Sequence, residues 1–349
     1  MTSPPHLLEL SPSQWREWFV ANGWPPFRAA QLADWVFRRW AACFDEMSDL
    51  PRSLRAALAE RFRLWTTEVA ACRRSDDGTQ KLLLRLADAE SIECVLLCEP
   101  SGRRTACVST QVGCGMACAF CASGLHGVAR NLTRGEILEQ WLRLAQQLAP
   151  DERLSHLVVM GMGEPLANLD ALLPALSTVT DPLCGGISAR RVTISTVGLP
   201  KAILRLAEEN VPYHLAVSLH AADDALRDRL VPANRGLGIE AILRAADAYF
   251  AATGRRVTYE YVMLAGVNDR PTDARRLAAL LRGRCALVNL IPYNPVVGLP
   301  FKTPKADHVA RFAQALQRAG IRVKRRYRRG NHIDAACGQL RRRCGDDSS

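Results

Sequence analysis

The sequence predicts an α/β fold in which six strand–helix units follow a small helical domain and a short β-rich connector. Three observations predict it. Aromatic residues recur at helical spacing up to about residue 64, and the apolar period then switches to two until about residue 100. From residue 104 onward, strand-like and helix-like patterns alternate. Such alternation gives a parallel sheet with its helices outside, either an open sheet or a partial barrel.

Composition places the chain among ordinary globular proteins, with 48% hydrophobic and 23% charged residues. No apolar run reaches the roughly 18 residues that a membrane span needs. Met1 to Leu10 lacks the basic-then-apolar layout of a signal peptide, so we expect a cytoplasmic protein with no membrane partner. Twelve cysteines then suit a reducing compartment. The net charge of +11 favours a polyanionic partner such as nucleic acid.

The first domain, residues 1–64, is expected to be helical. Its apolar residues are spaced by three and four positions: Trp15, Trp18, Phe19, Phe27, Leu32, Trp35, Val36 and Trp40. Gly23 with Pro25-Pro26 separates the first helix from the second, and Asp49-Leu50-Pro51 begins a third. The arginines on the outer faces are candidate RNA contacts, with an ordinary solvated surface as the alternative: Arg28, Arg38, Arg39, Arg52 and Arg55.

The connector, residues 65–100, contains a hairpin signal at Asp76-Asp77-Gly78. Strands are expected around 81–86 and 92–98, and Glu93 lies in the second of them. Cys94 and Cys98 share one face of that strand. With no third ligand nearby, we interpret them as core cysteines rather than as metal ligands.

Residues 101–330 carry the six strand–helix units. The expected strands are 104–110, 155–161, 191–197, 213–219, 256–264 and 286–291. The expected helices are 133–148, 168–179, 199–209, 239–252, 270–282 and 304–319.

Short polar motifs stand where these strands end. Gly161-Met162-Gly163-Glu164-Pro165 follows the second strand, Ser195-Thr196 closes the third, and Ser218-Leu219-His220 closes the fourth. Ile291 to Pro295, which includes Asn294, follows the sixth. Chemistry gathers at the carboxyl ends of parallel strands, so these motifs predict one site along that edge.

Three cysteines, Cys114, Cys118 and Cys121, follow the first of these strands within eight residues. Thiolates are the ligands that iron–sulfur clusters prefer, and short spacings let one loop hold one cluster. Three ligands for four irons would leave the fourth iron open to a small molecule. The alternatives are a zinc site or three unrelated cysteines, but no second CxxC half stands nearby.

The tail, residues 331–349, follows a strongly basic stretch and carries a lone cysteine. Cys337 lies in Ile333-Asp334-Ala335-Ala336-Cys337-Gly338-Gln339-Leu340, between arginine-rich segments. The alternative to a reactive thiol is a small buried hydrophobic residue, which the basic, glycine-flanked setting disfavours.

Taken together, these motifs resemble the RlmN/Cfr family of radical S-adenosylmethionine (radical-SAM) RNA methyltransferases, on the RlmN side, over about residues 8–340. The matching segments are 107–114, the cluster loop, 161–165, 218–221, 260–262, 266–269, 289–292 and 335–340. The resemblance implies a partial (β/α)6 radical-SAM barrel. It also implies a [4Fe-4S] cluster on Cys114, Cys118 and Cys121, with SAM on the open iron.

The resemblance further implies a reaction that uses two SAM molecules and two cysteines outside the cluster. Cys337 is methylated first, and a radical then forms on its methyl group and adds to an adenine. Glu93 matches the proton acceptor, with an exposed strand-edge carboxylate as the alternative. Cys107 then attacks the sulfur of Cys337 and releases the product, leaving a Cys107–Cys337 disulfide.

For SAM, the resemblance implies contacts from the strand-end motifs: Gly163, Glu164, Ser195, Ser218, Leu219, His220 and Asn294. For Ser195 and Asn294 the alternative is a turn or cap residue. The sequence departs from the family pattern at 123–127, Asn331-His332 and Val296-Val297. These positions remove no ligand and no reactive cysteine, so they bear on substrate choice.

The expected function is methylation at C2 of an adenosine in the peptidyl-transferase centre of 23S rRNA, with the adenosine 3′ of the tRNA anticodon as a second candidate. The alternatives are Cfr-like methylation at C8, another RNA, or a non-catalytic RNA-binding module. A methylthiotransferase or glycyl-radical activase would need further cluster cysteines, which the spacing does not offer. Expected partners are RNA and a reductant such as flavodoxin or ferredoxin, and we expect a monomer.

Overall fold

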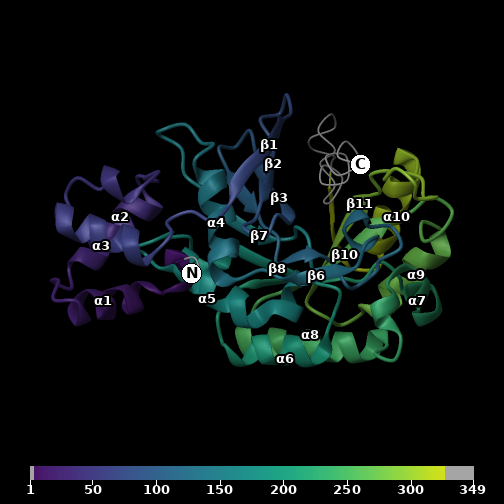
Figure 1. Cartoon of the computed structure of the whole chain (residues 1–349). Coiled ribbons are helices and arrows are strands. Elements are labelled where there is room, and N and C mark those ends of the chain that lie inside the picture. The colour runs from purple at the N-terminus through teal and green to yellow at the C-terminus, as the bar shows by residue number, and fades with distance from the viewer. Residues whose placement is uncertain (1–3, 327–349) are drawn as a thin grey trace.

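A ten-stranded mixed sheet forms the body of the protein in the computed structural model, which describes residues 4–326. Cys337 lies outside the described residues. In spatial order the strands are β1 (Glu68–Arg74), β2 (Gln80–Arg85), β3 (Ser91–Cys98), β4 (Arg104–Cys107), β7 (His156–Val159), β8 (Val192–Thr196), β9 (His214–Ser218), β10 (Val257–Met263), β11 (Ala286–Pro292) and β12 (Arg322–Arg325). Strands β4 and β7–β12 run parallel, whereas β1–β3 extend the sheet as antiparallel strands (Figure 1).

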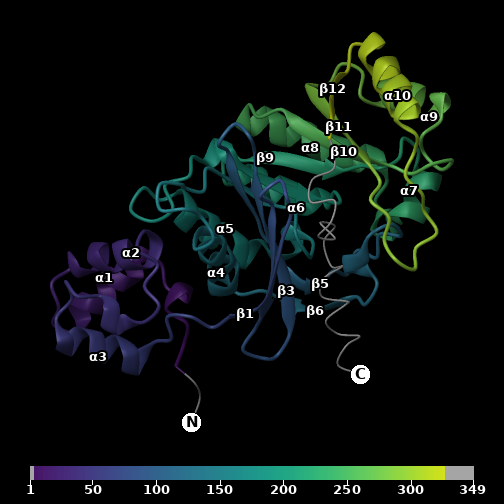
Figure 2. The ribbon, with the colours of Figure 1, turned by 90° about the horizontal axis from the view of Figure 1, so that it is seen from above.

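Six helices follow the parallel strands as predicted. They are α4 (Arg134–Ala145), α5 (Leu169–Thr180), α6 (Pro200–Glu208), α8 (Ile239–Thr253), α9 (Pro271–Leu280) and α10 (Ala306–Arg318). The six predicted strands are also present, each within a few residues of its predicted bounds. Because β1 and β12 both end the sheet, it is a partial barrel rather than a closed one (Figure 2).

One helix and several short strands were not predicted from the sequence. The helix α7 (Asp224–Leu230) is too short to show a helical period. The strands β5 (Gln111–Gly113) and β6 (Val128–Asn131), which pair as a hairpin, are too short to show an alternating pattern. The strand β12 contains three basic residues out of four, which hide its alternation. It nevertheless pairs in parallel with β11, so seven parallel strands are present where six were predicted.

The N-terminal domain contains the three predicted helices, α1 (Pro12–Ala21), α2 (Arg28–Phe37) and α3 (Arg52–Arg61). Ser11 and Gln14 form a capping box that starts α1. The predicted break at Gly23 and the helix start after Pro51 are both confirmed. Some of the outer arginines contact their own domain, since Arg28 donates to Gln31 and Arg39 pairs with Asp34.

Cys94 is buried in the main core, as predicted, and Cys98 is half-buried against the same core. The predicted Asp76-Asp77-Gly78 turn joins β1 to β2, with Gly78 in the left-handed region at φ +79°.

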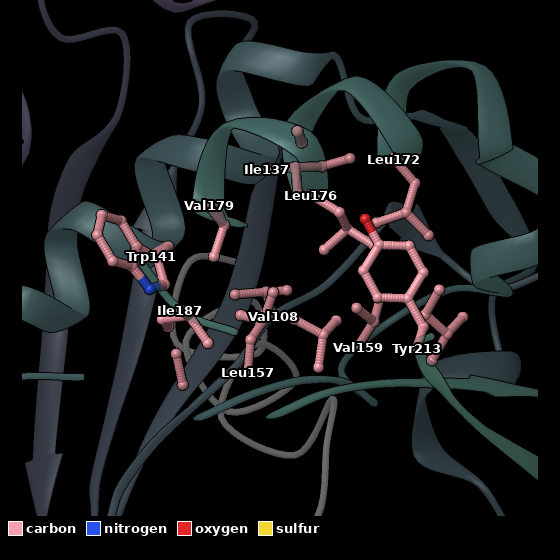
Figure 3. Packing of buried hydrophobic residues seen from close by; sticks show 14 of the residues in the cluster. Val108, Ile137, Trp141, Leu157, Val159, Leu172, Leu176, Val179, Ile187 and Tyr213 are labelled. Atoms are coloured by element: carbon pink, nitrogen blue, oxygen red, sulfur yellow. The ribbon is translucent and has the colours of Figure 1, made fainter. Parts of the chain in front are cut away.

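Helices α4 and α5 cover the outer face of the sheet. Figure 3 shows Ile137 and Trp141 of α4, together with Leu176 of α5, packed over Leu157 and Val159 of β7. This apolar layer fixes the strand order beneath it and leaves the opposite face of the sheet uncovered by these helices.

That opposite face is concave and polar. Along β8 the outward residues are buried, whereas Thr193 and Ser195 on the other face are half-exposed. The registers of the parallel strands continue this row through Ser218 of β9 and Glu260 of β10. A sheet whose inner face carries half-exposed polar residues provides a surface for a ligand rather than a second core.

A buried carboxylate joins the N-terminal domain to the barrel. Glu139 of α4 is 0% exposed and accepts hydrogen bonds from the backbone N–H and hydroxyl groups of both Thr66 and Thr67, at 2.7–3.1 Å. His6 lies 3.5 Å from the same carboxylate, and burial lowers its pKa. These contacts hold Thr66 and Thr67, which follow the helical domain in the chain, against α4.

Within residues 4–326, no helix is long and apolar enough to span a membrane.

We predict that Glu139→Gln lowers the free energy of unfolding by about 1–3 kcal/mol, because the amide places N–H donors against the donors of Thr66 and Thr67. Denaturant unfolding would measure the change, with the exposed residue Glu17 as the control in Glu17→Gln. Equal stabilities of the two variants would contradict the conclusion that Glu139 joins the N-terminal domain to the barrel.

Candidate active site

The cysteine loop is held by the β5–β6 hairpin. Cys114 follows β5, and its backbone N–H donates to the carbonyl of Gly127 at 2.8 Å. The N–H of Cys121 donates to the carbonyl of Cys118 at 3.0 Å, and Ala117 between the ligands adopts a left-handed conformation at φ +52°. All three cysteines are half-buried. The loop therefore presents its three sulfurs from one compact turn.

The chemistry of this donor set fits an iron–sulfur cluster. Burial raises the pKa of the Cys114 thiol to about 11 and that of Cys118 further, and charge on the neighbouring cysteines adds to both shifts. Such thiolates need a nearby cation. Among residues 4–326, no three His, Cys, Asp or Glu side chains converge on a single metal ion. A cluster does not require that convergence, because each thiolate binds a different iron.

Glu164 lies beside this loop with its carboxylate buried. It accepts hydrogen bonds from the backbone N–H of Leu166 at 3.0 Å and of Val197 at 2.8 Å, which join the loops after β7 and β8. Burial raises its pKa to about 7, and those donors oppose the shift. A carboxylate in this setting can bind a cationic group of a ligand.

Two segments approach so closely that only glycine fits between them. A Cβ on Gly161 would lie 2.5 Å from Ser109 Oγ, and one on Gly163, where φ is +99°, would lie 2.6 Å from Gln111 Cβ. Ser109 Oγ donates to the carbonyl of Glu93 at 2.6 Å and accepts from the N–H of Met162 at 2.8 Å. The segment after β4 and the segment after β7 therefore form one unit.

Gln111 completes this unit. Its Oε1 accepts from the N–H of Glu164 at 2.8 Å, and its Nε2 donates to Asn131 at 2.7 Å. Gln111 lies in the matching segment 107–114, but this contact was not predicted. An amide side chain next to a cluster loop was the available signal, but its partner is 53 residues away in the chain.

Ser195, Ser218 and Asn294 lie at the carboxyl ends of β8, β9 and β11, on or beside the polar face. All three are half-buried. Within residues 4–326 their side chains make no hydrogen bond, and none of them caps a helix. Polar groups with little access to water ordinarily have hydrogen-bond partners. Since these three side chains bond to no other described residue, they are available to a bound ligand.

His220 has a local structural function beside the cluster loop. It adopts a left-handed conformation at φ +57°, and its ring packs edge-on against Phe120 with centroids 4.8 Å apart. Burial lowers its pKa to about 3, so the ring is neutral. Its Nδ1 accepts from the N–H of Val262 at 3.1 Å, which leaves the proton on Nε2. Leu219, beside it, is fully buried.

Glu93 and Cys107 lie on one face of the sheet. Cys107 pairs with Val95 across the β3–β4 ladder, and Glu93 is two residues from Val95. Glu93 is 2% exposed and lies 2.9 Å from the ammonium group of Lys81, which is 0% exposed. The exposed strand-edge alternative for Glu93 is therefore wrong. Lys81 was not predicted, although a lysine directly before the apolar run Leu82–Leu84 was a signal.

The structure thus brings together the cysteine loop, Gly163, Glu164 and the ends of β8 and β9, with Glu93 and Cys107 on the adjoining strands. Cys337 cannot be placed, since it lies outside the described residues.

Comparison with known proteins gives the class of this site. Residues 108–278 match the radical SAM superfamily model, and residues 5–64 match the ribosomal RNA large subunit methyltransferase N-terminal domain. The crystal structure of a radical SAM methyltransferase from Sphaerobacter thermophilus superposes with a TM-score of 0.93 at 44% identity, covering 96% of this chain and 99% of that one. The fold is that of a radical SAM methyltransferase.

Curated relatives narrow the class to one family. A probable dual-specificity RNA methyltransferase RlmN from Rhodopirellula baltica is 56% identical, covering 98% of this chain and 92% of the relative. The dual-specificity RNA methyltransferase RlmN from Alkalilimnicola ehrlichii is 44% identical, covering 96% and 93%. The chain belongs to the RlmN family. It is an RNA methyltransferase of the radical SAM class, with a [4Fe-4S] cluster and SAM as its cofactors.

We predict that Gly163→Ala lowers the free energy of unfolding by about 1–3 kcal/mol more than Gly283→Ala does. Both glycines have positive φ, but a Cβ on Gly283 would meet nothing within 4 Å, so the control isolates the clash with Gln111. Denaturant unfolding of both variants would measure the difference. Equal losses would mean that the two segments can separate without cost.

Proposed function

We propose that this enzyme methylates C2 of an adenosine in the peptidyl-transferase centre of 23S rRNA and of the adenosine 3′ of the anticodon in tRNA. One observation carries the proposal. A buried carboxylate, Glu93, and a buried cysteine, Cys107, share the polar face of the sheet beside the cysteine loop. Methylation at an unreactive ring carbon needs a base for the ring proton and a thiol to release the product, and these two residues supply them.

The proposed cofactor contacts follow the edge of the sheet. Cys114, Cys118 and Cys121 would hold the cluster. Glu164 would bind the SAM ammonium group beside Gly163, and Ser195, Ser218-Leu219-His220 and Asn294 would line the remainder of the pocket. When bound, the reduced cluster and SAM supply the radical chemistry that activates a methyl group. The protein's contribution is to orient SAM and the adenine around this edge.

Glu93 would accept the ring proton. Its ion pair with Lys81 at 2.9 Å stabilises the charged carboxylate although both groups are almost completely buried. A carboxylate held away from water is suited to removing a proton from carbon. Lys81 would stabilise the carboxylate before the transfer.

Cys337 and Cys107 would act in turn on the transferred carbon. In this proposal the sulfur of Cys337 carries the methyl group taken from the first SAM. That methyl group would lose a hydrogen atom to the radical that the second SAM supplies and would bond to C2, and the one electron released with the ring proton would be taken up by the cluster. After Glu93 takes the ring proton, the Cys107 thiolate attacks the sulfur of Cys337. The carbon–sulfur bond breaks, its electron pair stays with the product carbon, which is protonated, and a Cys107–Cys337 disulfide forms. An external dithiol would reduce that disulfide.

The positions that depart from the family pattern bear on which RNA the enzyme binds. Val297 is 77% exposed and residues 125–127 are exposed, whereas Ser123 and Val296 are buried. Such exposed positions beside the site are suited to contacts with RNA rather than with buried cofactors. The proposal also includes a flavodoxin or ferredoxin as reductant, a monomeric state and the cytoplasm as the compartment.

We expect reconstituted enzyme with SAM and dithionite to form 2-methyladenosine in 23S rRNA and in tRNA, detected by mass spectrometry of the nucleosides after anaerobic reaction. Cys107→Ala should accumulate a covalent RNA–protein adduct, whereas Cys337→Ala should form neither product nor adduct. 8-Methyladenosine would instead assign the enzyme to the Cfr side of the family. Wild-type turnover by both variants would refute the two-cysteine mechanism.

We further predict that Lys324→Gln weakens RNA binding and reduces the slope of log K against log salt concentration by about one. Lys324 pairs in register with Asn289 and acts electrostatically on Glu260, which places it on the polar face of the sheet. Arg325 lies on the other face, so Arg325→Gln is the matched control. Equal slopes for the two variants would remove the inner face of β12 from the RNA interface.

A further inference from the structure

The short helix α7 carries a buried arginine for which no ion pair is found among the described residues. Arg227 is 1% exposed, although its guanidinium ordinarily carries a full charge. It instead donates to main-chain carbonyls: from Nε to Leu219 at 3.1 Å, and from Nη2 to Ser218 at 3.0 Å and to Val197. These carbonyls stand at the ends of β8 and β9.

The remaining donor of Arg227 bonds to the side chain of Asn234. Asn234 in turn donates to Asp224 at 3.0 Å and to Asp228 at 2.5 Å. The amide therefore stands between the guanidinium and both carboxylates. A direct ion pair is the usual compensation for a buried charge. Here Asp224 and Asp228 act on Arg227 only from beyond the amide of Asn234.

Helix α7 also lies against the cluster loop. Arg227 is close enough to Cys118 for a charge on one side chain to act on the other. Burial lowers the pKa of Arg227 to about 10, so the side chain stays charged at neutral pH. The carbonyl of Leu230, at the end of α7, also accepts the N–H of Ala119 at 2.9 Å. Helix α7 thus touches both the cluster loop and the two strand ends.

A positive charge beside a cluster ligand has a defined effect on reduction. Gaining one electron makes a cluster held by thiolates more negative, and a nearby cation stabilises the more negative state. In a buried, low-dielectric setting that effect is stronger than in water. The same side chain fixes the backbone of Val197, Ser218 and Leu219, where the proposed SAM pocket lies.

From this geometry we infer that Arg227 is a positioning residue that locks the ends of β8 and β9 against the cluster loop and favours one-electron reduction of the cluster through its charge. The inference rests on the proposed cluster and SAM contacts. It adds a residue that acts on the cluster and on SAM without contacting the atoms that react.

The test is a dithionite titration of the reconstituted enzyme without RNA, followed by electron paramagnetic resonance, together with SAM binding by equilibrium dialysis. Arg227→Gln removes the charge, and we expect about a tenfold smaller ratio of reduced to oxidised cluster at a fixed potential, which is about 59 mV for one electron. Arg227→Lys keeps the charge but loses the forked contacts, so it should retain the potential and bind SAM at least tenfold more weakly.

The matched control is Arg134→Gln. Arg134 is also a buried guanidinium that donates to carbonyls, those of Leu8 and Leu10, but it lies at the junction with the N-terminal domain. It should lose stability without a change in potential or SAM affinity.

An Arg227→Gln variant that contains the cluster and has the wild-type reduction potential would refute the effect of the Arg227 charge on cluster reduction. An Arg227→Lys variant with wild-type SAM affinity would refute the role of Arg227 in positioning the strand ends. If Arg227→Gln does not fold, Arg227→Met of similar length provides the neutral variant. An Arg227→Lys variant that contains the cluster but has a shifted reduction potential would also refute the electrostatic effect, because it keeps the positive charge. A wild-type chain that binds no cluster would instead refute the proposed function itself.

Discussion

The close approach of the Gly161–Glu164 segment to residues 109–111 is the constraint on which the site depends. Two positions in it have no room for a Cβ, and Ser109 and Gln111 bridge the two segments through their side chains. Because the cysteine loop continues directly from residue 111, its distance from Glu164 is fixed by this contact rather than by a flexible loop. A metal site and a carboxylate that must act on one ligand need such rigid support.

Three buried ionisable groups around this unit are stabilised in three different ways, and each way matches a different chemical task. Glu93 has a direct ion pair with Lys81, which compensates for the burial of both charges. Burial raises the pKa of Glu164 to about 7 although hydrogen-bond donors oppose the shift, and a cationic ligand would be its natural partner. Burial and the nearby charge of Arg227 lower the pKa of His220 to about 3, so the ring stays neutral, which suits a packing and hydrogen-bonding position.

The sequence predicted the parts of this structure that leave a local pattern. The six strand–helix units, the hairpin turn at Asp76-Asp77-Gly78 and the helix start after Pro51 each follow from periodicity or turn chemistry within a short window. It could not predict β12, because charged residues hide the alternation, nor the Lys81–Glu93 pair, which depends on the register of β2 against β3. The Gln111–Glu164 contact joins residues 53 positions apart and leaves no local trace. Family resemblance supplied candidates such as Glu93, but burial and pairing came only from the fold.

The order of strands bears on the proposal that the second reactive cysteine is Cys337. Glu93 and Cys107 lie on β3 and β4, to one side of the strands whose ends carry the proposed SAM contacts, so an adenine between SAM and Glu93 must be reached from the open concave face. The chain leaves β12 at the far edge of the sheet, yet Arg326 already reaches Met160 after β7, with Nη2 and Sδ 4.0 Å apart. Cys337 follows Arg326 by eleven residues, which can span at most about 40 Å. The proposed role of Cys337 needs its thiol at the open face of the sheet, and this length of chain does not exclude it.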